Sequence, residues 1–422
     1  MLSDDLTGTV DCVSLACGCK EPVPTMVCAD GNVEILPRTK AREIVAVNLS
    51  SRTIPGKEAY QRTYDAAVKV RDYPDQLLMK KMDTGFRGNA GYEIEGIFDA
   101  TGKRLCFIMD HIPMRKTFTL YGHQYAAGQI LSKSAFSRDD KLKAPRESYI
   151  PAILQKQTDI PVGSVDIDAV KGTNLVEKVK EQIDAGKRIL VFDAISEADG
   201  LKVISTLQPI YPDVLWAGST GIVEALITYL YGPVTLDLRH TVHEQCICFS
   251  GTAYEMTRNQ IAFAKERVGL KVIDLDMDLV MDGKADQARA QGIDAFLAEN
   301  KAGSNVLMRP RVTDGRFDQK AVASAIMDNL SACAGEICKT AKFDRILIVG
   351  GETSQAVFTR LGVNTLEMEQ PPEIGAGEGI VADGSIKGKR FVLKGGSTGN
   401  TYSLLHMMGI WDQPDDPNRT EL

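Results

Sequence analysis

The sequence predicts an α/β protein built from two α/β domains with largely parallel sheets. Apolar runs of strand type alternate with helical stretches over most of the chain, which is the α/β pattern. The 422 residues are also more than one compact core usually holds. Tyr231-Gly232-Pro233 stops the helix-like stretch before it, so we predict domains at 1–232 and 233–422.

The composition is that of an ordinary globular chain, and it excludes several function classes. Apolar residues make up 44% of the chain, charged residues 25%, and the net charge is −7. This acidic balance argues against a nucleic-acid partner or an anionic-membrane surface. No apolar run approaches the ~18 to 20 residues that span a bilayer, and the N-terminus lacks a signal-peptide core. With nine cysteines and no CxxC pair, we expect a cytoplasmic protein with reduced thiols.

The clearest strands of the first half are short apolar runs at 43–49, 76–82, 188–193 and 213–217. The last run leads into an amphipathic helix over 222–230. The polar stretch from Leu105 to Pro161 predicts a long excursion from the core, such as a lid or a substrate loop. The polar, proline-containing tail from Trp411 onward predicts a frayed end.

Asp4 and Asp5 are adjacent carboxylates just ahead of Leu6-Thr7-Gly8. Such a pair can supply a general base for a hydroxyl group and a ligand for Mg²⁺. The alternative interpretation is a cap at the start of a helix.

A second polar segment follows the strand at 76–82 and contains Lys81, Asp83, Arg87 and Gly88. The carboxyl ends of parallel strands are where α/β sheets bind ligands. Arginine can clamp a carboxylate through two hydrogen bonds, and aspartate can accept hydrogen bonds from sugar hydroxyls. Arg52, after another strand, has the same character. We interpret these residues as a site for a small polyhydroxy acid, with a solvated charged turn as the alternative.

Three strand–glycine–helix junctions mark the second half. They are Ser250-Gly251-Thr252, Gly350-Gly351-Glu352-Thr353-Ser354 and Lys394-Gly395-Gly396. Glycines at such a junction let backbone N–H groups turn inward, and a helix start carries partial positive charge, so the set predicts a phosphate cradle. For any single junction, a capped helix is the alternative. The Walker A and GxGxxG fingerprints are absent.

Taken in order, these motifs resemble those of the four-carbon acid sugar kinases, and the resemblance runs nearly end to end. It comprises the Asp4-Asp5 opening, Ser50-Ser51-Arg52, the segment from Lys81 to Asn89, Phe192 to Asp199, Ala217 to Ile222, the Ser250 junction with Thr257 and Gln260, and the two later glycine segments. The resemblance implies an N-terminal sugar-acid domain, a C-terminal nucleotide domain and an active site in the cleft between them.

The resemblance also implies the chemistry: ATP-dependent phosphorylation, with Mg²⁺, of the terminal hydroxyl of threonate, erythronate, a 3-oxo-tetronate or a close relative. Asp4 and Asp5 would be catalytic, the three junctions would bind ATP, and the metal ligands are not identified. Substrate would be bound by Arg52, Lys81, Asp83, Arg87 and Gly88. The partners would be the sugar acid and ATP, without nucleic acid or membrane, and a homo-oligomer is compatible with the sequence. The alternative is a relative that binds sugar acid or nucleotide without phosphoryl transfer.

Three features depart from the family pattern. Relatives have a strand before the paired aspartates, whereas only Met1 and Leu2 precede Ser3, so the first strand is either incomplete at this start or lost. Gly85 stands where the family has a threonine, which removes one candidate contact to the acid. Thr398 replaces an aromatic residue of the last glycine loop.

Overall fold

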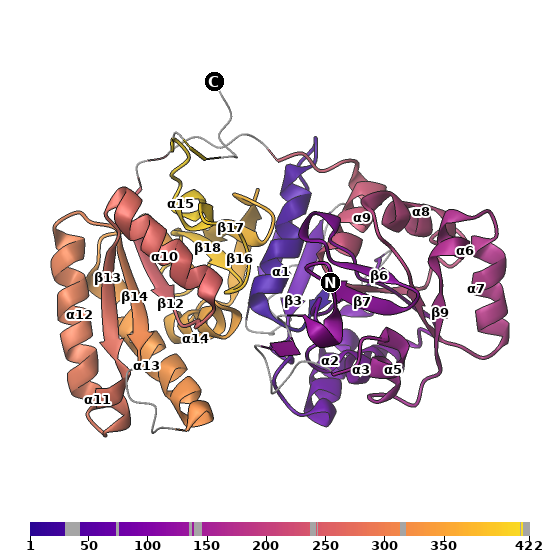
Figure 1. The fold of residues 1–422 in the computed structure, drawn as a ribbon, viewed down its shortest axis with the longest axis horizontal. Coiled ribbons are helices and arrows are strands. Elements are labelled where there is room, and N and C mark those ends of the chain that lie inside the picture. The colour runs from indigo at the N-terminus through magenta and orange to yellow at the C-terminus, as the bar shows by residue number, and fades with distance from the viewer. Residues whose placement is uncertain are drawn as a thin grey trace. The chain divides into compact units, whose positions relative to one another are not determined.

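The computed structural model describes residues 1–29, 43–72, 76–134, 137–138, 146–236, 242, 244–312, 318–413 and 415–416. The chain divides into two compact units. Unit 1 is Met1–Pro24 with Gly31–Thr235, and unit 2 is Thr25–Asp30 with Leu236–Leu422. Each unit combines a sheet with covering helices, which confirms the predicted α/β class (Figure 1).

The described residues of unit 1 contain a mainly parallel sheet, a small antiparallel sheet and several helices. The strands are β1 (Leu2–Ser3), β3 (Ile44–Asn48), β4 (Met79–Lys81), β5 (Cys106–Met109), β6 (Phe118–Leu120), β7 (His123–Ala126), β8 (Gln129–Ile130), β9 (Val162–Val165), β10 (Ile189–Phe192) and β11 (Leu215–Gly218). The helices are α1 (Leu6–Val13), α2 (Gly56–Val70), α3 (Ala90–Thr101), α5 (Ile150–Gln155), α6 (Ile167–Lys171), α7 (Leu175–Asp184), α8 (Glu197–Leu207) and α9 (Thr220–Tyr231), with short 3₁₀ turns at Ser14–Gly18, Pro113–Arg115 and Leu131–Lys133.

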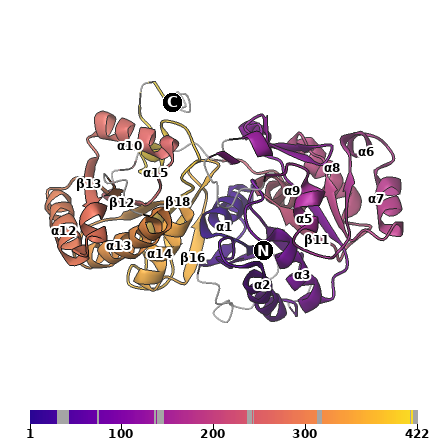
Figure 2. The ribbon, with the colours of Figure 1, turned by 60° about the horizontal axis from the view of Figure 1, so that its bottom comes forward.

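The larger sheet of unit 1 has the order β3-β1-β4-β11-β5-β10-β9, and its neighbouring strands are parallel. Strands β5, β10 and β11 are buried along their whole length, as expected for a parallel sheet that is covered on both faces. Helix α2 packs on α3, while α9 packs on α1 and α8. Figure 2 shows α2 and α3 side by side from a second direction.

The expectation of one long excursion between Leu105 and Pro161 is wrong in its first part. Cys106–Met109 forms the fully buried strand β5, which pairs with β10 and β11 inside the sheet. Four apolar residues between polar neighbours give a weak strand signal, and burial between two partner strands overrides it. The excursion proper begins after β5 and contains the antiparallel β6–β7–β8 sheet. Residues 135–136 and 139–145 of this stretch lie outside the described residues.

The first strand is present, so the alternative that it is lost is wrong. Leu2 and Ser3 form β1, which pairs in parallel with β3 on one side and β4 on the other. Two residues are too few for a periodic signal, and the strand exists because both of its edges find partners. Asp4 and Asp5 therefore follow a central strand directly, and Asp5 caps α1 by accepting from the Gly8 N–H.

Unit 2 likewise joins one sheet to helices. Its described strands are β2 (Thr25–Cys28), β12 (Cys246–Ser250), β13 (Lys271–Asp276), β14 (Val306–Arg311), β15 (Arg345–Val349), β16 (Thr365–Glu369), β17 (Ala376–Val381) and β18 (Arg390–Lys394). Its described helices are α10 (Glu255–Val268), α11 (Met277–Met281), α12 (Ala285–Lys301), α13 (Gln319–Thr340), α14 (Gly351–Leu361) and α15 (Ser403–Met407).

The sheet of unit 2 has the order β13-β14-β12-β15-β18-β17-β16-β2. The first five strands of this order, from β13 through β14, β12 and β15 to β18, pair in parallel. Strand β17 pairs antiparallel with β18 and with β16, and β16 pairs antiparallel with β2. Helices α12, α13 and α14 pack in a row, and α10 packs on α15 (Figure 1). Among the described residues, no helix is long and apolar enough to cross a membrane.

The described part of the tail is anchored, so the expectation of a frayed end is wrong for it. The Trp411 ring stacks on the His406 ring at 3.9 Å between centroids. The carboxylate of Asp416 lies 2.5 Å from Nε2 of His406 and is buried. Glu373 contacts the other ring nitrogen at 3.0 Å. Burial lowers the pKa of His406, but hydrogen bonds and charge from the two carboxylates raise it above its ordinary value overall.

Candidate active site

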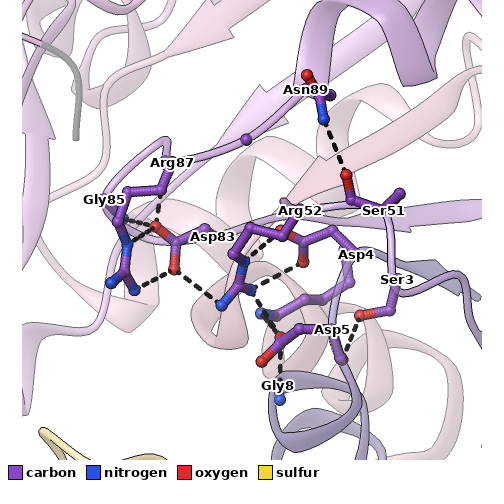
Figure 3. A network of polar contacts seen from close by, with 12 residues as sticks. Ser3, Asp4, Asp5, Gly8, Ser51, Arg52, Asp83, Gly85, Arg87 and Asn89 are labelled. Atoms are coloured by element: carbon purple, nitrogen blue, oxygen red, sulfur yellow. Dashed lines mark hydrogen bonds and ion pairs between the residues drawn. The ribbon is translucent and has the colours of Figure 1, made fainter. Parts of the chain in front are cut away.

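The polar residues predicted in the first half lie together at one edge of the unit 1 sheet. Asp4 and Asp5 follow β1, Asp83 comes two residues after β4, and Arg52 lies in the loop after β3. These strands are neighbours in register, with Ser3 opposite Asn48 and Lys81. Since the carboxyl ends of parallel strands share an edge, the three loops converge. Figure 3 shows Arg52 between the Asp4–Asp5 pair and Asp83.

Arg52 is the centre of this cluster. Its Nε donates to Asp4 Oδ2 at 2.8 Å, and its Nη2 donates to Asp4 Oδ1 at 3.0 Å and to Asp5 Oδ1 at 2.6 Å. Its Nη1 lies 3.6 Å from Asp83 Oδ1. Three carboxylates therefore share one guanidinium, whose planar fork suits two-point contact with carboxylates.

Asp83 is held mainly by its own loop. Arg87 forms a two-point pair with it, Nε to Oδ2 and Nη2 to Oδ1, both at 2.8 Å. The backbone N–H groups of Gly85 and Arg87 also donate to Oδ2, at 3.0 and 3.2 Å. Burial alone would raise the pKa of Asp83, but the charges of Arg87 and Arg52 hold it far below its usual range. Asp83 is thus a fixed anion, and Arg87 is largely committed to it.

Glycine is required at two places in the cluster. Gly88 has φ +113°, and a Cβ there would lie 3.3 Å from the Arg52 side chain, so this backbone packs against the guanidinium arm. A Cβ on Gly8 would come 2.3 Å from Lys81 Nζ and 2.5 Å from Asp5 Oδ1. Because Gly8 has no side chain, the Lys81 ammonium and the Asp5 carboxylate have space to approach each other.

Lys81 and Lys80 are adjacent but have different surroundings. Lys80 Nζ is fully buried, 3.1 Å from Glu93 Oε2, and it donates to the Lys81 carbonyl at 2.8 Å. Lys81 Nζ makes no hydrogen bond to any described residue, and the nearest carboxylate, Asp5 Oδ1, is 3.8 Å away. Burial lowers the pKa of Lys81, but the acidic groups around it, including Asp5 and Asp4, raise it overall. Lys81 is therefore a charged donor with free hydrogen-bonding capacity.

The two paired aspartates differ in access. The side chain of Asp4 is 3% exposed, and that of Asp5 is 15% exposed. Burial raises the pKa of Asp4, but Arg52 and Lys81 lower it below its ordinary value overall. Asp5 accepts from Thr7 Oγ1 at 2.8 Å, which fixes its orientation. Asp4 is placed to hold Arg52, and Asp5 is the carboxylate that a ligand can reach.

The three glycine junctions of unit 2 also come together. Strands β12, β15 and β18 are neighbours, and Ser250, Val349 and Lys394 are aligned across them. A Cβ on Gly251 would lie 2.4 Å from Thr353 Oγ1, and a Cβ on Gly396 would lie 2.3 Å from Thr252 Oγ1. Each loop thus approaches its neighbour closely enough to need glycine. This is the convergence of backbone and hydroxyl groups that phosphates require.

Helix α10 holds the last of these loops. Thr257 Oγ1 donates to the Gly396 carbonyl at 2.6 Å, and Gln260 Nε2 donates to the carbonyls of Thr398 and Asn400 at 3.2 and 2.7 Å. The buried Lys394 ammonium donates to the carbonyls of Gly395 and Thr398 in the same loop, both at 2.9 Å. Lys394 therefore shapes the loop from inside. Thr398, which departs from the family pattern, donates to the carbonyls of Gly395 and Gly375 at 2.9 and 3.3 Å.

Helix α14 starts at Gly351 with no side-chain cap, so its N-terminal dipole remains open to an anion. Gly350, just before it, has φ +113°, and Ser354 Oγ donates back to the Gly350 carbonyl at 2.8 Å. The Ser250 hydroxyl is buried and makes no hydrogen bond to a described residue. No group of three His, Cys, Asp or Glu side chains that could hold a metal is found among the described residues.

Two further polar residues lie at the same edge of unit 1: Asp110, which the sequence did not indicate, and Ser219, which lies in the Ala217–Ile222 motif but was given no role in the site. Asp110 follows β5 and Ser219 follows β11, and both are fully buried. A carboxylate directly after an apolar run is the same signal that identified Asp4. For Asp110 this signal is weak, because the apolar run before it, Cys106–Met109, has only four residues and stands in the polar stretch after Leu105.

Comparison with protein families agrees with this arrangement. Residues 1–226 match a model described as a sugar-binding N-terminal domain, and residues 247–404 match a nucleotide-binding C-terminal domain. The chain belongs to the four-carbon acid sugar kinase family. The resemblance inferred from the ordered motifs is therefore confirmed at the level of the family.

Relatives named as sugar-acid kinases match most of the chain at low identity. A D-threonate kinase of Salmonella typhimurium is 26% identical over 96% of both chains. A D-erythronate kinase of Heliobacterium modesticaldum is 21% identical over 85% of both chains. A 3-oxo-tetronate kinase of Methylobacterium radiotolerans is 27% identical over 79% of this chain and 81% of its own. These relatives share a chemistry and differ in the acid they are named for.

Solved structures of similar proteins support the fold. A Salmonella typhimurium LT2 protein crystallised under the name tRNA synthase superposes with a TM-score of 0.79, at 19% identity and with 96% of this chain and 97% of its own covered. A Haemophilus influenzae protein gives a TM-score of 0.70 at 17% identity, with coverage of 97% and 98%. At these identities the likeness concerns the fold alone.

Proposed function

We propose that this protein is an ATP-dependent kinase that phosphorylates the terminal hydroxyl of a four-carbon sugar acid of the threonate, erythronate or 3-oxo-tetronate type, or of a close relative. The observation that carries the proposal is the cluster around Arg52, which offers three cations and three carboxylates at one sheet edge. Cations suit the carboxylate of an acid, and carboxylates suit its hydroxyls. The same chain carries the three-junction cradle typical of phosphate binding.

In this proposal the residues of unit 1 have different roles in binding the acid and in the reaction. Lys81 has unused donors, and together with Arg52, whose side chain is 17% exposed, it would bind the carboxylate of the acid. Arg87 would act mainly by fixing Asp83, to which it is paired at both nitrogens. Asp5 would orient the reacting hydroxyl and accept its proton, because it is the more accessible of the paired aspartates.

In unit 2 the phosphates of ATP would lie on the loops at Gly251, Gly351 and Gly396. The open start of α14 and the hydroxyls of Thr252 and Thr353 support this placement. Mg²⁺ in kinases commonly arrives on the nucleotide phosphates with one or two carboxylates, and it would neutralise charge on the transferred group.

The test is a release assay for ADP with MgATP and each stereoisomer of threonate and erythronate, together with 3-oxo-tetronates. We expect turnover with at least one acid. If calorimetry instead shows binding of an acid or of ATP but no acid gives ADP, the protein is a binding relative without phosphoryl transfer. Absence of binding of every acid and of ATP would exclude both functions.

A further inference from the structure

The carboxyl edge of the unit 1 sheet continues beyond the Arg52 cluster to Asp110. Across β4, β11 and β5 the register aligns Lys81, Gly218 and Met109. Asp110 is the residue after Met109, so it faces the same edge two strands away from Lys81. The charges of Asp83 and Lys81 both act on the pKa of Asp110, which places its carboxyl in their neighbourhood.

One oxygen of this carboxyl makes no hydrogen bond to a described residue, although the Gln124 side chain lies close enough to lower the pKa of the carboxyl. The hydroxyl of Ser219 donates to Asp110 Oδ1. Asp110 Oδ2 is buried and makes no hydrogen bond to any described residue. The whole side chain is 0% exposed. A buried polar oxygen without a partner is costly, so it indicates that a ligand or a water belongs there.

The chemistry of Asp110 follows from its burial. Burial favours the neutral acid and raises the pKa of Asp110 well above its ordinary value, although hydrogen bonds from Ser219 and Gln124 and the charge of Lys81 lower it. In the neutral form that burial favours, Oδ2 carries the proton, because Oδ1 already accepts from Ser219. In that form Oδ2 is a neutral hydrogen-bond donor, in a site whose other donors are cations.

The backbone of Asp110 is also linked by hydrogen bonds to the loop that contains Asp83. Thr119 Oγ1, on β6, lies 3.0 Å from the Asp110 carbonyl and 2.9 Å from Gln124 Oε1. Gln124 Nε2, on β7, donates to the Thr84 carbonyl at 3.3 Å. The small antiparallel sheet thus ties the end of β5 to the residue next to Asp83.

We propose that Asp110 is a specificity-determining residue of the sugar-acid site, donating a hydrogen bond from Oδ2 to an oxygen on C2 or C3 of the acid. The proposal rests on the proposed function of this site. A neutral donor does not compete for the carboxylate of the acid, which the cations attract more strongly. It distinguishes acids that carry this oxygen from acids that lack it, because an unfilled donor penalises the deoxy acid.

The experiment measures acid binding to the full chain by calorimetry, without ATP. The ligands are the preferred tetronate, its 2-deoxy analogue (3,4-dihydroxybutanoate) and its 3-deoxy analogue (2,4-dihydroxybutanoate). Wild type should bind one deoxy acid about tenfold or more weakly than the tetronate. In Asp110→Leu this discrimination should fall to about twofold or less, whereas Asp110→Asn, which keeps a donor, should retain most of it.

Thr63→Val serves as the matched control, because the Thr63 hydroxyl on α2 is also buried without a partner. This variant should discriminate as wild type does. If Asp110→Leu does not fold, Asp110→Ala answers the same question with a smaller side chain. Unchanged discrimination in the leucine or alanine variant would overturn the proposal, as would equal binding of all three acids by wild type. If wild type binds no tetronate, the proposed function has failed, and the role of Asp110 falls with it.

Discussion

Arg52 couples the three aspartates, and its geometry separates their roles. Both Asp4 oxygens are bonded to the guanidinium, whereas Asp5 contributes only Oδ1 to it. Asp5 keeps partial exposure, and Asp83 is fixed by Arg87. The sequence predicts that Arg52 and Asp83 belong to one site because each follows a strand. The strand order that brings Asp4 and Asp5 beside them is known from the structure. The sequence could not show which carboxylate is accessible, since that depends on how three side chains share one guanidinium.

The paired aspartates provide the first prediction. Asp5→Asn should lower kcat by about 10² or more with a small change in the KM for the acid, because it removes the proton acceptor. Asp4→Asn should mainly raise the KM for the acid, because it releases Arg52 from its two-point hold. Steady-state kinetics on both variants measures the split. Full kcat in Asp5→Asn would show that Asp5 is not the base.

Asp83 provides a prediction on pH. Its pKa is depressed in the folded protein, so its stabilising contribution is present above the unfolded pKa of about 3.9 and is lost as pH falls below it. Asp83→Asn should therefore reduce the free energy of unfolding by about 3 kcal/mol at pH 5 to 8, because Arg87 loses its buried partner. The gap between wild type and variant should shrink below about pH 4.

Denaturant unfolding between pH 3 and 8 would measure this gap. Asp72→Asn is the matched control, since the Asp72 side chain is 84% exposed and its 3.6 Å ion pair with Arg71 is open to solvent. Its free energy of unfolding should stay within about 0.5 kcal/mol of wild type. A gap for Asp83→Asn that is constant down to pH 3 would contradict the depressed pKa.

At the scale of elements, the sequence predicted well where apolar runs were long and poorly where partners decide the structure. The runs at 43–49 and 188–193 contain β3 and β10, and the helix at 222–230 lies within α9. Strand β1 has two residues and β5 has four, and both exist because strands pair with them on each side. The glycine junctions were recognisable because their chemistry is local. Their mutual contacts were not, since those depend on strand order.

The third prediction concerns the last glycine loop as an element. Gly396→Ala should weaken ATP binding about tenfold or more, because the new Cβ would lie 2.3 Å from Thr252 Oγ1 and 2.9 Å from the Tyr254 ring. Gly395→Ala should have a smaller effect, because its Cβ would approach Thr398 only to 3.3 Å. Calorimetric titration with ATP compares the two variants. Equal losses would show that the contact between the two loops does not position the nucleotide.

At the scale of the molecule, the path of the chain differs from a simple succession of two halves. Thr25–Asp30 belongs to unit 2, although the rest of the first 235 residues form unit 1. Within unit 2, β2 extends the sheet by pairing antiparallel with β16. The four residues of β2 carry no sequence signal that they pair with a strand as distant in the chain as β16. The domain boundary between residues 232 and 233, inferred from Gly232 and Pro233, stays a prediction. In the structure, the last boundary between the two units lies after Thr235.

The last prediction tests whether β2 completes unit 2. Val27 is fully buried and lies opposite Leu366. Ala29 N–H donates to the Asn364 carbonyl, and hydrogen-bonded pairs alternate along antiparallel strands, so Val27 is also a hydrogen-bonded position. In the full chain, Val27→Pro removes this donor and should raise amide exchange in peptides covering β16. Peptides covering β5 and β10 of unit 1 should exchange as in wild type and serve as the internal control. If β16 keeps its protection in the variant, β2 does not stabilise that edge, and unit 2 would be complete without the N-terminal strand.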